Sequence, residues 1–244
     1  MATAVHAGHD LRSDAAAAMA LPEADRLREE DPFTERFAGV VPNRFLAHRS
    51  RFELDLNRPR GRAVYLKPEH AWGLDVWREP PSNELLEESL RLYDGFYTEF
   101  AEVLSDMESR HGLFMVLDMH SYNHRRGGPQ APPDAAEANP DVNVGTSDLE
   151  LGRWGDLLDH FMDDLAAQGE GLDVRANVRF TGGHLIQWVQ KTCPRSSGSL
   201  AIEFKKTFMD EHTGDLDETR LDRLVNAFRA VLPGLQSELK GVAR

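Results

Sequence analysis

The segment from Leu113 to Ser121 constrains the fold of this chain more than any other. It reads LFMVLDMHS, an apolar run of strand length that ends in Asp118, His120 and Ser121. A buried strand with polar groups at its carboxyl end is typical of open α/β sheets, in which ligands bind in the crevice beyond the strand ends. We therefore expect a binding site there, with His120 as a candidate metal ligand.

The composition excludes several classes of protein. The 244 residues suffice for one large α/β domain, and no linker-like break divides them, so we expect a single domain over residues 1–244. Apolar residues make up 41% of the chain, but no window of about 18 apolar residues predicts a membrane span. The formal charge of -13 opposes binding to nucleic acid or to anionic membranes.

The cellular compartment is indicated by two further features. A single cysteine, Cys193, excludes an internal disulfide, which fits a reducing compartment. The amino terminus has no basic region followed by an apolar segment, so nothing predicts secretion. We expect a cytoplasmic protein, and the sequence does not determine its oligomeric state.

Apolar periodicity predicts that helices and strands alternate along the chain. This alternation favours a central mixed, mostly parallel sheet with helices on both sides. Strands are expected at 2–6, 63–66, 113–121, 141–145, 172–180 and 199–204, and extended structure is expected from 45 to 56, continuing as an alternating strand over 51–58. Helices are expected at 15–28, at 31–37 with Asp31 as N-cap, at 84–110 capped by Ser82, at 154–168, 184–190 and 217–239.

Charged and apolar residues alternate strictly from Arg51 to Arg58, which is the period of a half-exposed strand. The segment ends in Asn57 and Arg58, an amide beside a planar guanidinium. A guanidinium holds a carboxylate through two parallel hydrogen bonds, so this end is a candidate site for a substrate carboxylate. The alternative is a surface ion pair, the usual role of an arginine.

Candidate metal ligands stand at the ends of three elements. They are His6 or His9, one of the acidic residues 29–31, and His120. A hydrolytic zinc site needs about three nitrogen or oxygen ligands and one open position for water, often drawn from different loops at one sheet edge. Neither an HExxH nor a CxxC motif is present, so spacing alone does not choose among these residues.

Two carboxylates lie in otherwise apolar strands. Asp118 shares a strand face with His120, where it would orient the imidazole or cap the next turn. Glu203 lies within Leu-Ala-Ile-Glu-Phe, where burial is costly unless the carboxylate is paired or lies near a metal. A raised pKa of Glu203 would suit a general base, whereas a pair with Lys205 or Lys206 is the structural alternative.

Two irregular stretches border these candidates. Residues 123–140 are rich in Gly, Pro and Ala and predict a functional lid, whose Arg125 and Arg126 would close over an anion or stay solvated. Gly182 and Gly183 interrupt the chain before a short amphipathic helix. A GxSxG motif is absent, which disfavours a serine hydrolase.

The order of these segments resembles that of the N-formylglutamate amidohydrolases, from about His6 to about Asp210. The most specific parts are Asp-x-His-Ser at Asp118 and Asp-x-Asn-Arg at Asp55. The other matching segments are Val5–Gly8, Glu29–Thr34, Arg179–Gly183 and Ala201–Phe204. The resemblance implies a fold similar to zinc carboxypeptidases and aspartoacylases, with a central mixed sheet flanked by helices.

The resemblance also implies roles for individual residues. His6, Asp31 and His120 would hold a zinc ion (Zn²⁺), with His9 as an alternative to His6 and Glu30 as an alternative to Asp31. Glu203 would be the general base. A carboxylate of a small-molecule substrate would be bound by Asn57 and Arg58, and the pocket would be lined by Arg51, Gly182 and Gly183.

The expected reaction is hydrolysis of the amide bond of an N-formyl or N-acyl amino acid such as N-formylglutamate, releasing formate and the amino acid. A zinc carboxypeptidase or another N-acyl amino acid hydrolase is the alternative within enzymes. A noncatalytic protein that binds a metal or a carboxylate is the alternative outside them. A purely structural role would leave His6, Asp31 and His120 too far apart to share one ion, whose ligand atoms lie about 2 Å from it.

Overall fold

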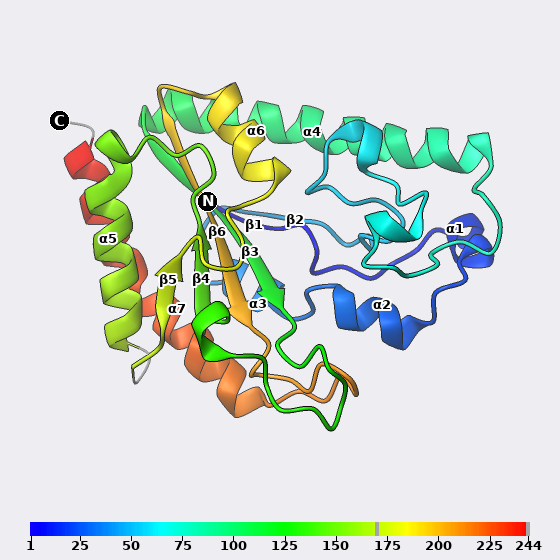
Figure 1. The fold of residues 1–244 in the computed structure, drawn as a ribbon. Helices are drawn as coiled ribbons and strands as arrows, with labels where there is room; N and C mark the ends of the chain where they lie inside the picture. Colours follow the sequence, from blue (N-terminus) through cyan, green and yellow to red (C-terminus); the bar gives the residue numbers. More distant parts are fainter. Residues whose placement is uncertain (169–170, 243–244) are drawn as a thin grey trace.

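The computed structural model describes residues 1–168 and 171–242, and its centre is a six-stranded sheet (Figure 1). Five strand pairs join the six strands, and all are parallel except β4 with β6. The predicted mixed, mostly parallel sheet is therefore confirmed. The strand order is β2 (Arg44–Leu46), β1 (Ala2–Ala4), β3 (Phe114–Tyr122), β6 (Ser197–Lys205), β4 (Val142–Gly145) and β5 (Val174–Ala176).

Helices cover both faces of the sheet, as the sequence predicts. One face carries α4 (Asn83–His111) and α6 (His184–Thr192), and the other carries α3 (Thr34–Ala38), α5 (Leu151–Gln168) and α7 (Glu218–Val242) (Figure 1). The short helices α1 (Ser13–Ala18) and α2 (Glu23–Glu29) lie beyond the β2 edge. Short 3-10 turns span Arg60–Arg62, Pro68–His70 and Ala136–Ala138. No helix of residues 1–168 or 171–242 is long and apolar enough to cross a membrane.

Strand β3 is buried along its whole length, as its apolar sequence predicts. Successive side chains of a strand point to opposite faces. Met115, Leu117 and Met119 pack under α3, α5 and α7, whereas Phe114 and Val116 pack under α4 and α6. The same alternation places Asp118 and His120 on the α4 and α6 face, beyond the last apolar residue of that face.

Three strand predictions are corrected by the structure. Residues 51–58 and 63–66 form turns, and only Val174–Ala176 of the predicted strand at 172–180 is extended and paired. Arg51 to Leu56 are all buried rather than half-exposed. The alternation misled the prediction because each charged side chain has an interior partner: Glu53 accepts from Arg12, and Asp55 from Arg51.

The predicted helix at 31–37 begins later than expected. Phe33 adopts a left-handed φ of 70°, so α3 starts at Thr34, whose hydroxyl and backbone N–H both donate to the Asp31 carbonyl. The prediction that Asp31 caps this helix is therefore wrong. Its carboxylate is free to lie against His6 and His120 instead.

Packing around α3 yields a test of the core. Phe37 is fully buried and stacks on Phe204 at a centroid distance of 4.0 Å, with Phe208 and Phe228 at its edges. We expect Phe37→Ala to lower the free energy of unfolding by about 3–5 kcal/mol, since it removes buried surface and leaves a cavity. Urea denaturation measures the change.

The matched control is Leu151→Ala, because Leu151 is 58% exposed. Its substitution should change the free energy of unfolding by less than about 0.5 kcal/mol. A loss below about 1 kcal/mol for Phe37→Ala would contradict the packing described for α3.

Candidate active site

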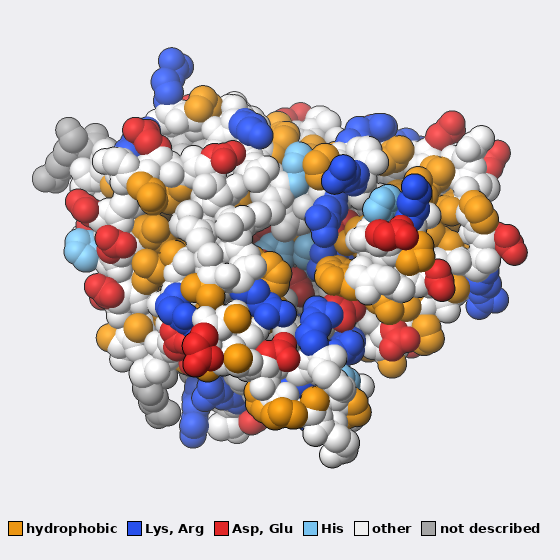
Figure 2. Space-filling model, in the orientation of Figure 1, with side chains coloured by type: hydrophobic (Ala, Val, Ile, Leu, Met, Phe, Trp, Pro, Cys, Tyr) orange, Lys and Arg blue, Asp and Glu red, His pale blue; other side chains and the backbone are white. Residues whose placement is uncertain are grey.

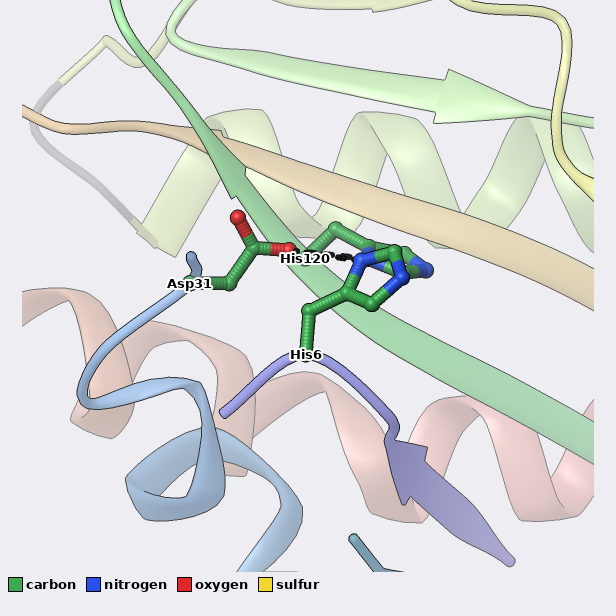
Figure 3. A group of neighbouring side chains, drawn as sticks. All are labelled: His6, Asp31 and His120. Atoms are coloured by element: carbon green, nitrogen blue, oxygen red, sulfur yellow. Dashed lines mark hydrogen bonds and ion pairs between the residues drawn. The ribbon is translucent and has the colours of Figure 1, made fainter. Parts of the chain in front are cut away.

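Polar residues gather at the carboxyl ends of three adjacent parallel strands. His6 follows β1, His120 lies near the end of β3, and Glu203 stands directly opposite His120 on β6. Asp31 joins them from the segment between α2 and α3, and its backbone N–H donates to the His6 carbonyl at 2.9 Å. One ligand atom each from His6, Asp31 and His120 lies within 4.8 Å of the others (Figure 3). The structure thus brings together the three predicted metal ligands.

The two imidazoles are arranged alike. Nε2 of His6 lies 2.7 Å from Asp55 Oδ1, and Nε2 of His120 lies 2.8 Å from Asp118 Oδ2. Because a carboxylate only accepts, each Nε2 carries a proton and donates it. Nδ1 of His6 and Nδ1 of His120 lie 3.3 and 3.0 Å from the same oxygen, Oδ2 of Asp31.

Asp118 is itself held in place. It is fully buried, and its Oδ1 accepts a hydrogen bond of 2.6 Å from the Thr3 hydroxyl on β1. Of the roles that the sequence left open for Asp118, the structure therefore supports the orientation of His120.

Asp55 performs the same task for His6 and was missed as a site residue. It is fully buried and accepts from Arg51 Nη2 at 2.9 Å, from the Asn57 backbone N–H at 2.8 Å and from the Tyr65 hydroxyl. Burial raises the pKa of Asp55, but Arg51 and His6 outweigh it and hold the pKa well below its usual range. Alternation in the sequence had indicated solvent exposure at this position.

The chemistry of the three grouped residues fits a metal ion. Two imidazole nitrogens and one carboxylate oxygen make a three-ligand set of the kind found in hydrolytic zinc sites. Nδ1 of His6 is buried and has no hydrogen-bond partner within the described residues. Carboxylates that accept from the far nitrogens, as Asp55 and Asp118 do, are typical of metal-binding histidines. Burial raises the pKa of Asp31, but the two histidines lower it overall.

Glu203 is a partly buried carboxylate without a counterion. Neither candidate lysine pairs with it: Lys205 binds Asp141 at 2.8 Å, and Lys206 donates to the carbonyls of Arg28 and Glu30. The Glu203 carboxylate forms no hydrogen bond to the residues that the structure describes, 1–168 and 171–242. Burial raises its pKa from 4.5 to about 7, more than the histidines lower it. Such a group exchanges a proton readily near neutral pH.

A cavity of about 720 Å³ opens over this group. Figure 2 shows histidine at the bottom of a hollow that is bordered by Lys and Arg side chains. The walls include all the residues predicted to bind substrate: Arg51, Asn57, Arg58, Gly182 and Gly183.

The glycine pair allows the close approach of Asn57. Gly182 adopts a φ of 107°, which side chains disfavour, and a Cβ at Gly183 would collide with the Asn57 amide. Oδ1 of Asn57 accepts from the Leu185 N–H at 2.9 Å, and its Nδ2 lies 3.3 Å from His120 Nε2. This packing places the Asn57 amide beside the histidine group.

The alternative ligands lie elsewhere. His9 is exposed and lines a different cavity, and Glu30 accepts from Arg26 and Ser50.

Arg126 of the predicted lid lines the active-site cavity, where it binds Glu29 through two hydrogen bonds of 2.9 and 3.0 Å. The wall also includes Trp72, Arg179 and Lys206, to which the sequence assigned no substrate role. Arg179 begins the matching segment that ends in Gly182-Gly183, so its place in that segment was the available signal.

The chain resembles proteins of known structure over nearly its whole length. A structure of N-formylglutamate amidohydrolase from Ralstonia eutropha JMP134 matches with a TM-score of 0.74 at 17% identity, covering 97% of this chain and 93% of that one. The gene product Atu2144 from Agrobacterium tumefaciens matches with a TM-score of 0.68 at 15% identity, covering 98% and 91%. These similarities show a shared fold. A metallo-carboxypeptidase from Burkholderia cenocepacia scores 0.40 at 14% identity, covering 97% and 57%.

No curated protein matches the sequence. The family model described as N-formylglutamate amidohydrolase matches residues 1–209, which include every residue of the group described above. This chain therefore belongs to the N-formylglutamate amidohydrolase family.

Proposed function

We propose that this protein hydrolyses the amide bond of an N-formyl amino acid such as N-formylglutamate, with a zinc ion held by His6, Asp31 and His120. The observation that carries the proposal is the three-ligand group beside Glu203, a carboxylate with a raised pKa and no counterion. Membership of an amidohydrolase family supports the reaction class. When bound, zinc would lower the pKa of water towards about 7 and polarise a carbonyl.

The protein's own residues then have distinct tasks. Asp55 and Asp118 keep both Nδ1 atoms of the histidines directed at Asp31. Glu203 accepts a proton from the attacking water as the water adds to the formyl carbon. The same carboxyl returns this proton to the leaving nitrogen as the C–N bond breaks, which releases formate and the free amino acid.

The substrate is oriented by Arg58 and Asn57 on the wall of the cavity. Arg58 exposes 46% of its side chain and lies 3.7 Å from Asp55, so its guanidinium retains donors for a ligand. Together with the Asn57 amide it would bind one carboxylate of the substrate. Binding of that carboxylate holds the formyl group in one position relative to Glu203. Such positioning lowers the reaction barrier, because the reacting groups no longer have to find one another in solution.

The direct test is release of formate from N-formylglutamate by wild type and Glu203→Gln. Glutamine keeps the shape of the side chain but accepts no proton, so turnover should fall by about 10²–10⁴-fold while the zinc content is unchanged. Glu238→Gln, at a surface glutamate that is 42% exposed, should retain wild-type turnover.

Two results would reject the mechanism: undiminished turnover by Glu203→Gln, or full activity after the metal has been removed with a chelator. Faster turnover of longer N-acyl chains or of peptides would instead indicate another hydrolase of this fold. Binding of the substrate without turnover in wild type would identify a noncatalytic carboxylate-binding protein.

The raised pKa of Glu203 predicts a pH-dependent stability in the metal-free protein. Below pH 4.5 the carboxyl is protonated in both folded and unfolded chains; above pH 7 it must ionise inside the folded chain. The free energy of unfolding should therefore fall as the pH rises through this window, by at most roughly 3.5 kcal/mol at about 1.4 kcal/mol per pKa unit.

Glu203→Gln has no such proton to lose. Urea denaturation at pH 5 and at pH 8 measures the effect. Between these two pH values the denaturation midpoint should fall less for Glu203→Gln than for wild type. Parallel pH profiles for the two proteins would show that Glu203 does not titrate with a raised pKa.

Asp55 yields a separate prediction about metal binding. We expect Asp55→Asn to weaken zinc binding by about 10–100-fold, because the amide supports the His6 proton less well than the carboxylate does. Competition with a chelating dye measures the affinity. Asp94→Asn, at a half-exposed aspartate that pairs with Arg60, is the control. Equal zinc affinities for the two variants would mean that Asp55 does not act through His6.

A further inference from the structure

Arg179 lies on the wall of the active-site cavity in the segment between β5 and α6. Arg58 reaches the same cavity from the segment between β2 and α4. Since β2 and β5 are the two edge strands of the sheet, these arginines approach the cavity from opposite edges. The strands that carry His120 and Glu203 lie between them.

The backbone around Arg179 is fixed by a buried amide. Oδ1 of Asn143 accepts from the N–H groups of Val178 and Arg179 at 3.0 and 2.8 Å, and its Nδ2 donates to the Phe180 carbonyl at 2.8 Å. Asn143 is fully buried on β4, where it stands directly opposite Glu203. The position of Arg179 is thus tied to the strand that carries the proposed general base.

The guanidinium of Arg179 also lies against two aromatic rings. Its Cζ lies 5.1 Å from the centre of the Tyr122 ring and 5.5 Å from that of Phe180, and Nη1 donates to Asn139. Aromatic faces attract a guanidinium without occupying its N–H donors. The side chain is therefore ordered before any ligand arrives.

Arg179 differs from the other arginines of the cavity in having no anionic partner. Arg51 pairs with Asp55 and Arg126 with Glu29, whereas Arg179 lies within 4.0 Å of no carboxylate in residues 1–168 and 171–242. Its Nε is buried and makes no hydrogen bond to the described residues. Leaving a cation half-buried without a counterion is costly, which is expected where a ligand provides the charge.

We propose that Arg179 binds a second carboxylate of the substrate and so selects N-formyl derivatives of acidic amino acids over those with neutral side chains. The assignment rests on the proposed function, in which Arg58 and Asn57 hold the first carboxylate. A guanidinium pairs with a carboxylate through two parallel N–H donors, and a neutral carboxamide offers only one acceptor in its place.

The test compares N-formylglutamate with N-formylglutamine, which has the same shape but an uncharged side chain. Arg179→Gln should lower kcat/KM for N-formylglutamate by roughly 10- to 100-fold, mostly through KM, the range expected when charge-assisted hydrogen bonds are lost. For N-formylglutamine the value should change by less than about threefold. Arg179→Lys, which keeps the charge, should recover part of the preference.

Arg62→Gln is the matched control, because Arg62 is exposed and lies outside the cavity. Its selectivity should equal that of wild type. An equal loss for both substrates in Arg179→Gln would assign Arg179 a structural role only, and an unchanged preference for N-formylglutamate would overturn the proposal.

Binding of unreactive ligands separates this proposal from the proposed function. Calorimetry with glutarate and butyrate should show that wild type prefers the dicarboxylate and that Arg179→Gln loses the preference. If no formate is released but this preference is present, the proposed function fails and the role of Arg179 stands. If formate is released and wild type binds both ligands equally, the role of Arg179 fails alone.

Discussion

The active-site group depends on two buried carboxylate–imidazole hydrogen bonds. Asp55 binds Nε2 of His6 and Asp118 binds Nε2 of His120, so both Nδ1 atoms converge on one oxygen of Asp31. Without these bonds each ring would be free to turn, and no common ligand position would exist. Other segments position the two carboxylates. Thr3 on β1 donates a hydrogen bond to Asp118, and the turns after β2 place Asp55 next to His6.

The free-energy cost of burying these charged side chains has to be offset by partners close to each of them. Asp55 is satisfied by Arg51, Tyr65 and a backbone N–H, whereas Glu203 and Arg179 have no partner of opposite charge within the described residues. Buried groups that lack a partner destabilise a fold and persist mostly where function requires them. In this protein the two unpaired charges face one cavity, one as the proposed general base and the other as the proposed ligand for a substrate carboxylate.

The irregular segments matter as much as the sheet. The turns from Arg51 to Leu56 are buried and fold Asp55 inward, and Phe33 adopts a left-handed conformation that releases the Asp31 side chain from the helix. Gly182 and Gly183 leave room for Asn57 beside His120. The first two of these features oppose the simplest local preference of their sequence, whereas the glycines adopt a conformation that suits them. All three place a side chain at the site.

Sequence reasoning was most successful where a local pattern has one physical meaning. The apolar run at Leu113 predicted a buried strand, Ser82 was identified as a helix cap, and the polar end of the strand marked the edge at which the site lies. It failed where a pattern has two meanings. Charged residues that alternate with apolar ones between Arg51 and Arg58 indicate solvent exposure unless distant partners exist, and the partners Arg12 and His6 are invisible to a local rule.

By itself, the sequence determined the buried strand at Leu113, the long helix capped by Ser82, the residues able to bind a metal, and the two carboxylates in apolar strands. Only the tertiary structure decided that His6 rather than His9, and Asp31 rather than Glu30, join His120. It also revealed Asp55 as the support of His6 and Arg179 as an unpaired cation. The physical reason is that metal ligation, charge pairing and burial depend on distances between residues far apart in the chain, and parallel strand pairing sets those distances.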